Sequence, residues 1–136
     1  MTKPIPTIQR YMTTAPLSIG LEQTVAHAEQ VMSQHGIRHL PVLHGGQLKG
    51  ILSERDVRLI ETLKDVDATK VSVEDAMTQS VYSVAPEALL DEVVGEMAEH
   101  KYGCAVVMQN NKVVGIFTTV DACKALHDLL HGRLAK

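Results

Sequence analysis

The chain has few of the residues on which several protein classes depend. Aromatic side chains make up only 3% of the 136 residues, and tryptophan is missing altogether. Proteins that bind single-stranded nucleic acid stack its bases on aromatic rings, and such platforms are nearly absent here. The core must be aliphatic, because hydrophobic residues still reach 45% of the sequence.

Cysteine, long apolar runs and an excess of positive charge are also lacking. The two cysteines, Cys104 and Cys123, form neither a disulfide framework nor a metal-binding spacing. No apolar run approaches the roughly 18 residues of a membrane span, and the amino terminus lacks the apolar core of a secretory signal. The formal net charge is −3, with no basic stripe for a phosphate backbone. We expect a cytoplasmic protein without membrane insertion or direct nucleic-acid binding.

The chain does contain an internal duplication. A gapless shift of 65 residues aligns Met12-Thr13 with Met77-Thr78 and Gly50-Ile51 with Gly115-Ile116. A repeat of this length is the first feature to settle, because it decides the whole fold. We divide the chain into a lead-in at 1–9, a first repeat at 10–63, a connector at 64–72, a second repeat at 73–130 and a tail at 131–136.

Periodicity and turn residues predict the same elements in each half. In the first half we expect a helical turn at 10–13, an extended segment at 17–19, a helix after Thr24 that Gly36 ends, strands at 38–43 and 47–52, and a helix from Ser53 to about Leu63. In the second half we expect a helical turn at 73–77, an extended segment at 81–84, a helix at 89–100, strands at 104–108 and 112–117, and a helix at 121–130.

This pattern predicts an α+β fold made of two β-α-β-β-α repeats. A half of about 55 residues cannot bury both faces of its sheet well alone. We therefore expect the halves to pack sheet to sheet about a pseudo-twofold axis, with two equivalent clefts.

The most informative motif is a heptad that occurs twice, from Gly50 to Asp56 and from Gly115 to Asp121. Each copy reads glycine, two apolar residues, a hydroxyl residue, two variable positions and aspartate. A strand that runs into a helix presents backbone N–H groups to an anion, and an aspartate accepts hydrogen bonds from neighbouring sugar hydroxyls. The same spacing also fits a capping box, in which hydroxyl and acid satisfy backbone donors at the helix start. Both interpretations stay open at this stage.

The duplicated unit resembles a tandem CBS (cystathionine β-synthase) domain pair, the Bateman module, of the stand-alone type. The resemblance rests on Met-Thr at the head of each repeat, the stretch from His35 to Val42, and the two heptads. It covers residues 8 to 130. It implies a regulatory protein that binds AMP, ADP, ATP, NAD or S-adenosylmethionine, with no catalytic cofactor, and that signals to a separate effector protein.

The resemblance also implies two nucleotide-binding sites, each combining both repeats. One site would contain Leu17, Ser18, Ile37, Arg38, His39, Thr118 and Asp121. The other would contain Ser53, Asp56, Tyr82, Ser83, Tyr102, Gly103 and Cys104. Because Arg38 and His39 are basic where the second repeat has Gly103 and Cys104, we expect the Asp121 site to prefer phosphorylated ligands.

Other candidate sites have weaker support. His127 and His131 have a metal-compatible i, i+4 spacing, but a solvated helix face is the expected outcome and we predict no metal site. Cys104 is expected to be a buried, inert thiol. No nucleophile–base motif is present, so we predict that the chain is not an enzyme.

The last helix has an apolar stripe formed by Leu126, Leu129, Leu130 and Leu134. The stripe packs either on its own core or on another chain, and we expect a homodimer. The alternative to a nucleotide sensor is a structural or protein-interaction module of the same fold, in which the heptads only cap helices.

Overall fold

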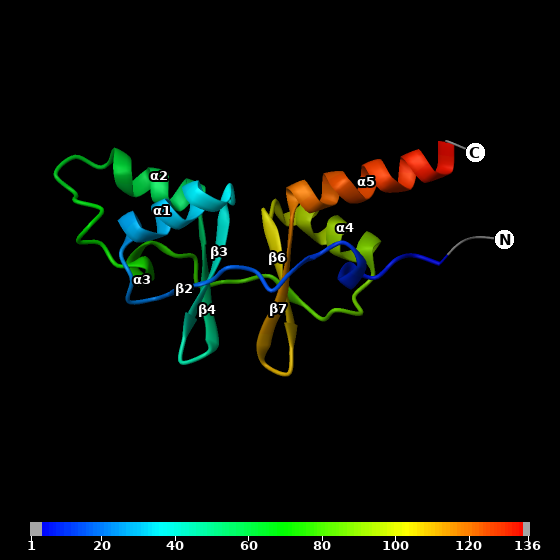
Figure 1. Cartoon of the computed structure of the whole chain (residues 1–136), viewed down its shortest axis with the longest axis horizontal. Helices are drawn as coiled ribbons and strands as arrows, with labels where there is room; N and C mark the ends of the chain where they lie inside the picture. The colour runs from blue at the N-terminus through cyan, green and yellow to red at the C-terminus, as the bar shows by residue number, and fades with distance from the viewer. Residues whose placement is uncertain (1–3, 135–136) are drawn as a thin grey trace. The chain divides into compact units, whose positions relative to one another are not determined.

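The computed structural model describes residues 4–134, and it has the expected α+β fold with two sheets and five α-helices (Figure 1). The chain forms two compact units. The first unit is Pro16–Val81. The second unit combines Met1–Ala15 with Tyr82–Lys136.

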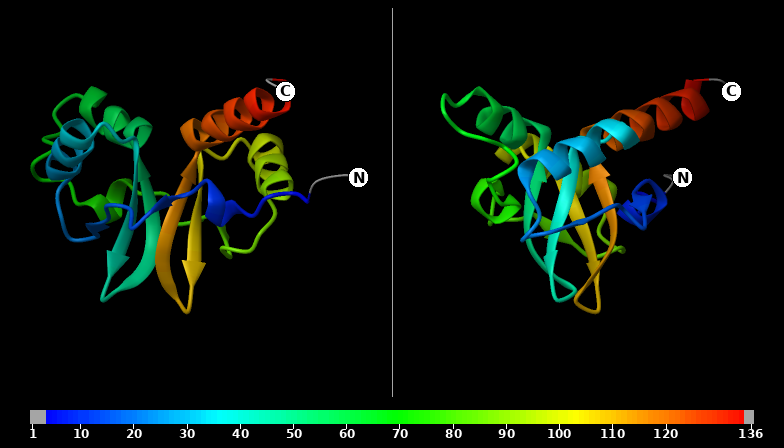
Figure 2. Two further views of the ribbon diagram at one scale, coloured as in Figure 1. Left: turned by 45° about the vertical axis from the view of Figure 1, so that its right-hand side comes forward. Right: turned by 60° about the vertical axis from the view of Figure 1, so that its left-hand side comes forward.

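The first unit contains a three-stranded sheet in the order β2-β3-β4. Its elements are β2 (Ile19–Gly20), α1 (Val25–His35), β3 (His39–His44), β4 (Gln47–Ser53), α2 (Glu54–Thr62) and α3 (Val73–Ala76). Strand β2 is parallel to β3, and β3 and β4 form an antiparallel hairpin. Helices α1 and α2 cover one face of that hairpin (Figure 2).

The second unit repeats this arrangement and adds an edge strand, giving the order β1-β7-β6-β5. Its elements are the 3-10 helix η1 (Ile8–Arg10), β1 (Thr13–Thr14), β5 (Ser83–Val84), α4 (Leu90–His100), β6 (Cys104–Gln109), β7 (Lys112–Thr118) and α5 (Thr119–Leu134). The two hairpins even share an irregularity, since the register shifts after Val42 and after Val107, at equivalent positions.

The predicted helix signals explain most boundaries. Thr24 caps α1, since its side chain accepts a hydrogen bond from the backbone N–H of His27 at 3.1 Å. Gly36 ends α1 in the left-handed conformation, with φ of 61°. In the second repeat Lys101 takes the same conformation, with φ of 60°, although it carries a side chain. Helix α5 is longer than predicted, because its first turn starts at Thr119 and it continues to Leu134.

The head of each repeat belongs to the unit built around the other repeat. Strand β1 pairs with β7, so Met12 and Thr13 lie in the second unit, where the Tyr11 hydroxyl also donates a 2.6 Å hydrogen bond to Asp128 on α5. In the same way Thr78 exchanges backbone hydrogen bonds of 2.9 Å with Ile51 in the first unit.

The close approach of these segments explains the heptad glycines. A Cβ atom at Gly50 would lie 2.6 Å from the sulfur of Met77 and 2.8 Å from the carbonyl oxygen of Thr78. A Cβ atom at Gly115 would meet the side chain of Met12. In each unit, the Met-Thr segment of one repeat therefore packs against the heptad glycine of the other repeat.

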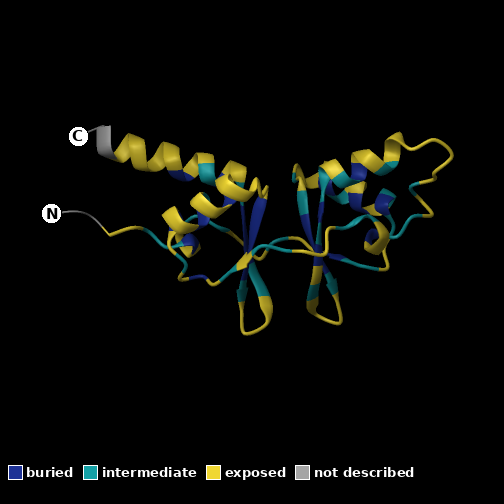
Figure 3. Ribbon diagram, turned by 180° about the vertical axis from the view of Figure 1, so that it is seen from behind, coloured by how far each residue is buried: buried dark blue, intermediate teal, exposed yellow. Residues whose placement is uncertain are grey.

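Each unit has its own aliphatic core, as the composition predicts. The first is centred on Val25, Leu40, Val42 and Leu52, and the second on Ile8, Val93, Val107 and Phe117, which is the only phenylalanine. Buried residues concentrate on the strands and on one side of each helix (Figure 3). Within residues 4–134, none of the helices combines the length and the hydropathy required to cross a bilayer.

Candidate functional site

Each heptad forms a strand-to-helix corner. We call Gly50–Asp56 the first corner and Gly115–Asp121 the second corner. In the first corner Ser53 is the last residue of β4 and the N-cap of α2. Its hydroxyl oxygen accepts a hydrogen bond from the backbone N–H of Asp56 at 3.1 Å. The Oδ2 atom of Asp56 accepts in turn from the Ser53 backbone N–H and hydroxyl, both at 3.0 Å. This is a complete capping box.

Two basic residues flank the first corner. His39 lies opposite Ser53 in the β3–β4 register, and the carbonyl oxygen of Arg38 accepts a hydrogen bond from the Glu54 backbone N–H at 2.8 Å. His39 is half-buried, and burial lowers the pKa of its ring, while the carboxylate of Asp56 acts in the opposite direction. Arg38 is exposed. The surroundings of the first corner therefore contain one carboxylate, one permanent cation and one titratable imidazole.

The second corner has the same local geometry with a more deeply buried acid. The Oδ2 atom of Asp121 accepts from the Thr118 backbone N–H at 2.9 Å, and the Thr118 hydroxyl oxygen is 3.4 Å from the Asp121 backbone nitrogen. Asp121 is only 6% exposed and is the one buried charged residue among the described residues. The hydroxyl of Thr13 donates a hydrogen bond of 3.3 Å to Oδ1 of Asp121.

The surroundings of the second corner carry rings and a thiol in place of cations. Cys104 lies opposite Thr118, and the Gly103 carbonyl oxygen is 3.3 Å from the Thr119 backbone nitrogen. Burial raises the pKa of the Cys104 thiol to about 12, so this thiol stays protonated and unreactive at neutral pH, as expected. Tyr102 stacks on Tyr82, with ring centroids 4.9 Å apart.

The corners retain binding capacity while they cap their helices. Among the hydrogen bonds of the described residues, Asp56 uses only Oδ2, which leaves Oδ1 as an acceptor. A carboxylate oxygen of this kind accepts well from a sugar hydroxyl. In the second corner Thr13 already donates to Oδ1, so a ligand hydroxyl would compete with this threonine.

Within each unit, the structure brings together residues that the sequence analysis assigned to different binding sites. The first unit groups Arg38, His39, Ser53 and Asp56 around one corner. The second unit groups Tyr102, Gly103, Cys104, Thr118 and Asp121 around the other, with Tyr82 stacked on Tyr102. Leu17 and Ser18 precede β2, Ile37 precedes β3, and Ser83 begins β5. The predicted combination of residues from both repeats in one binding site stays a prediction.

Sequence reasoning missed two features. The contact of Thr13 with Asp121 was indicated only by the recurrence of Met-Thr at the head of each repeat. The second feature is on α4, where ligand atoms of Glu96, Glu99 and His100 all lie within 4.8 Å of one another. Their i, i+3, i+4 spacing was visible in the sequence. The histidine pair that did stand out by its spacing, His127 and His131, is exposed, and its rings stack on each other at 5.7 Å.

Comparisons with known proteins agree with this geometry. The family model of the CBS domain matches residues 1–60 and 73–128. The CBS domain-containing protein YhcV of Bacillus subtilis is 31% identical over 110 residues, which cover 81% of this chain and 78% of that protein.

Two solved structures are similar over nearly their whole length. The crystal structure of a Vibrio cholerae protein assigned to acetoin utilization (AcuB) has a TM-score of 0.86 and 29% identity, covering 98% of both chains. The CBS domain pair of protein MJ0100, solved in complex with 5-methylthioadenosine and S-adenosyl-L-methionine, has a TM-score of 0.84 and 23% identity, covering 93% of this chain and 99% of that one. At 23% identity, the similarity to the MJ0100 domain pair shows only that the two chains share a fold.

Proposed function

The chain belongs to the CBS domain family, and from this premise we propose that it is a regulatory module that binds an adenosyl ligand and signals to a separate partner protein. The observation that carries the proposal is the duplicated corner with a carboxylate at a helix start, which in the first corner leaves Oδ1 of Asp56 as an acceptor for a ligand hydroxyl. The adenosyl compounds bound by the related domain pair support this ligand class.

We assign the binding roles residue by residue. Asp56 and Asp121 accept from the ribose hydroxyls, and Ser53 and Thr118 contact the ligand at the helix starts. Arg38 and His39 bind phosphate, because a guanidinium group forms charge-assisted hydrogen bonds with it and an imidazole N–H donates a hydrogen bond to it. The remaining residues line the base and sugar: Leu17, Ser18, Ile37, Tyr82, Ser83, Tyr102, Gly103 and Cys104.

The basic residues around the first corner have no counterpart in the second repeat. We therefore propose that a ligand held by Asp121 together with Arg38 and His39 carries phosphate, as AMP, ADP, ATP or NAD does. A ligand held by Asp56 with the two tyrosines would be less charged, as in S-adenosylmethionine. Calorimetry that shows two equal sites for ATP would contradict this asymmetry.

A bound ligand transmits a signal only if it binds one arrangement of the protein better than another. A coupling of about 1–3 kcal/mol is typical of such switches. We propose that the module acts as a homodimer in a reducing, cytoplasmic compartment, consistent with its unpaired cysteines. Catalysis is not part of this proposal.

The test is a thermal-shift and calorimetry series with AMP, ADP, ATP, NAD and S-adenosylmethionine. A ligand at 100 times its Kd stabilises the folded state by about 2.7 kcal/mol, which raises Tm by several degrees. The decisive variants are Asp56→Asn and Asp121→Asn. An asparagine oxygen still accepts the backbone N–H, so the cap remains, while the charge that strengthens the ribose hydrogen bond is lost.

We expect each decisive variant to weaken binding about tenfold, since charge assistance is worth about 1 kcal/mol or more. Asp75→Asn is the matched control. Asp75 follows Ser72 at the start of α3 with the same spacing, and its backbone N–H donates to the Ser72 hydroxyl, but it lies outside both corners. This control should bind the ligand like the unmodified protein.

The second candidate function is a structural or protein-interaction module without a nucleotide ligand. The capping geometry favours it, because both carboxylates already accept from local backbone N–H groups. In that case no compound would raise Tm. Asp56→Ala and Asp121→Ala would then cost only the cap, about 1 kcal/mol each.

A further inference from the structure

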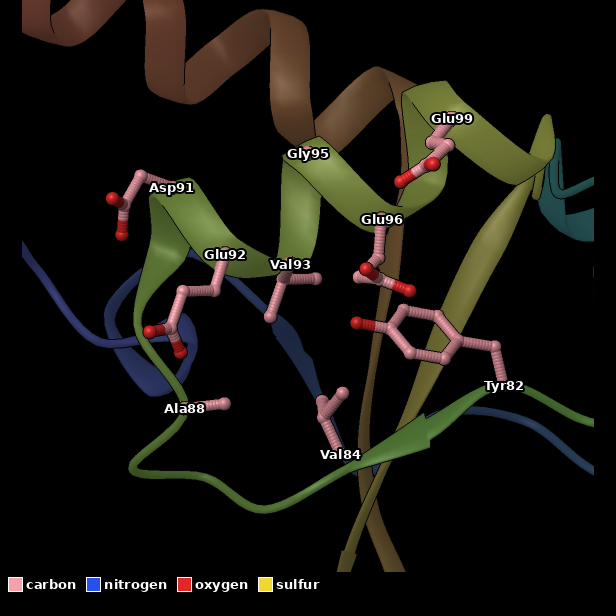
Figure 4. A pocket seen from close by; sticks show the side chains of 9 residues that line it. All are labelled: Tyr82, Val84, Ala88, Asp91, Glu92, Val93, Gly95, Glu96 and Glu99. Carbon is pink, nitrogen blue, oxygen red and sulfur yellow. The ribbon is translucent and has the colours of Figure 1, made fainter.

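The second unit has a hollow between β5 and α4 whose lining shares only Tyr82 with the proposed nucleotide sites (Figure 4). Its volume is about 570 Å³. Four carboxylates line it, from Asp91, Glu92, Glu96 and Glu99, together with Tyr82 and an apolar floor that includes Val93. We call this region the acidic hollow. In Figure 4 the ring of Tyr82 and the carboxylate of Glu96 lie close together, whereas the side chain of Glu92 points toward Ala88.

The stability of the helix explains only part of the charge of α4. Asp91 and Glu92 lie in the first turn, where the helix dipole favours acids, but Glu96 and Glu99 lie beyond it. The helix from Leu90 to His100 carries these four carboxylates and neither lysine nor arginine. Glu92 and Glu96 are like charges at i, i+4, which destabilises a helix by about 0.2–0.5 kcal/mol. Glu99 is next to the last helical residue, where the helix dipole disfavours a negative charge. Within the described residues, the only ion pair of α4 joins Glu96 to His100, and it needs a protonated imidazole.

The first repeat shows that the fold does not need this charge. At the positions equivalent to Glu96 and Glu99, helix α1 has Val31 and Gln34, and Leu17 stands in place of Tyr82. The two helices otherwise have the same length and position in their units. The acidic hollow is therefore a property of the second repeat and not of the family fold.

An aromatic wall adjoins the carboxylates. The Tyr102 ring stacks on Tyr82 at 4.9 Å and on His100 at 5.2 Å, so three rings form a continuous stack. Carboxylates accept hydrogen bonds from a guanidinium or ammonium group, and a tyrosine face attracts the same cation. Arginine matches both features best, because its planar group pairs with carboxylates and stacks on rings.

We propose that the acidic hollow is the docking site for a basic segment of a partner protein, with an arginine side chain inserted beside Tyr82. The carboxylates extend from Asp91 to Glu99, which is about 12 Å along a helix and matches a peptide segment better than a single ion. The surface is exposed at all four acids. Charge complementarity thus identifies the occupant, and the proposal stands without a nucleotide ligand.

The test uses the full chain and a defined probe, the acetylated and amidated peptide Arg-Leu-Arg-Arg. Its binding is followed by ¹H–¹⁵N NMR at 50 mM and 200 mM salt. The test variant is Glu92→Gln/Glu96→Gln/Glu99→Gln, and the matched control is Glu29→Gln/Glu61→Gln/Glu74→Gln, with the same change in net charge at exposed sites outside the hollow. A citrulline version of the peptide keeps the shape and removes the charge.

We expect amide shifts on β5 and α4, at least a tenfold loss of affinity in the test variant, and less than a twofold loss in the control variant. The citrulline peptide should not bind. NMR dispersion equal to that of the unmodified protein establishes that the test variant is folded. A second variant, Tyr82→Leu, introduces the residue found in the first repeat, and we expect it to lower the affinity for the peptide threefold or more.

Several results would overturn the proposal. Equal losses in the test and control variants would show that the peptide follows net charge alone. Shifts confined to other elements would place the peptide elsewhere. Saturable binding of Zn²⁺ at Glu96, Glu99 and His100 that prevents peptide binding would assign the hollow to a metal. Self-association of the unmodified protein that the test variant abolishes would assign it to a second copy of the chain.

Discussion

The hydroxyl of Thr13 lies 3.3 and 3.4 Å from the two carboxylate oxygens of Asp121, although 108 residues separate them in the sequence. This contact ties the head of the first repeat to the corner of the second. Thr13→Val should therefore lower the free energy of unfolding by about 1 kcal/mol, because the buried acid loses a donor. Urea denaturation measures the change.

Thr78→Val is the matched control for Thr13. Thr78 is the equivalent residue of the second repeat, and its hydrogen bonds with Ile51 involve only the backbone. This variant should change the stability by less than half as much. Equal effects at the two positions would show that the contact with Asp121 is not what stabilises the head segment.

The heptad glycines should differ in their tolerance of alanine. At Gly50 the new Cβ would lie 2.8 Å from a backbone oxygen of Thr78, which cannot move without the chain. At Gly115 it would meet the flexible side chain of Met12. We expect Gly50→Ala to cost about 2–3 kcal/mol and Gly115→Ala about 1 kcal/mol.

Thermal or urea unfolding of both glycine variants tests this ranking. Gly95→Ala is the control, since a Cβ atom at Gly95 would have no neighbour within 4 Å and the residue is inside helix α4. That substitution should stabilise the protein by about 0.5–1 kcal/mol. The ranking is contradicted if Gly115→Ala proves the more damaging of the two corner substitutions.

His39 should make the stability depend on pH below neutrality. Burial lowers the pKa of His39 in the folded protein below its ordinary value of 6.5, so the unfolded chain takes up the proton first. The stabilising effect of the neutral ring is complete above pH 6.5 and is lost as the pH falls through 6.5 toward the folded pKa. His39→Gln should reduce the stability difference between about pH 7.5 and about pH 5.5.

Urea denaturation at the two pH values measures that difference. The control is His44→Gln, at an exposed position at the end of β3. The His44 variant should retain the pH dependence of the unmodified protein. If both variants flatten the pH profile equally, the effect is not specific to the partly buried ring.

Lys101 and Gly36 occupy equivalent left-handed positions after α4 and α1. A residue with a Cβ loses about 1 kcal/mol or more in this conformation, whereas glycine adopts it freely. Lys101→Gly should therefore raise the free energy of unfolding by about 1 kcal/mol. Gly36→Ala should lower it by a similar amount, and denaturation curves that show the opposite signs would contradict the reasoning.

The two thiols should react at very different rates. Cys123 is exposed on α5, whereas Cys104 is buried and its pKa is raised to about 12. Iodoacetamide at about pH 8 should give a single adduct on the native protein and two adducts in urea, as read by intact mass and peptide mapping. Rapid native labelling of Cys104 would show that the second corner opens far more than its burial indicates.

Local signals predicted most of the fold. Apolar periodicity together with Thr24, Gly36 and Ser53 placed the main helices and hairpins within one or two residues, because these caps act over a single turn. The predicted end of α5 was misplaced, because the helix continues through Gly132, a residue type that commonly ends helices, although it buries little surface there. Leu126, Leu129 and Leu130 are exposed on it, and the Leu134 side chain is outside the described residues.

The candidate site was less accessible from the sequence. The heptad suggested both a capping box and a ligand carboxylate, and the structure shows that the box is formed in both corners. No local pattern could reveal that Thr13 contacts Asp121, because the contact depends on which unit receives the head segment. The roles of Arg38 and His39 in phosphate binding remain a prediction.

The head of each repeat completes the unit built around the other repeat, and this arrangement has a consequence for how such a pair evolves. Once Met12 covers Gly115 and Met77 covers Gly50, neither copy of the ancestral gene segment encodes a finished unit by itself. A deletion that removes one copy would leave the survivor with the wrong covering strand or none. Substitutions at Met12 and Gly115, or at Met77 and Gly50, therefore act on both repeats at once.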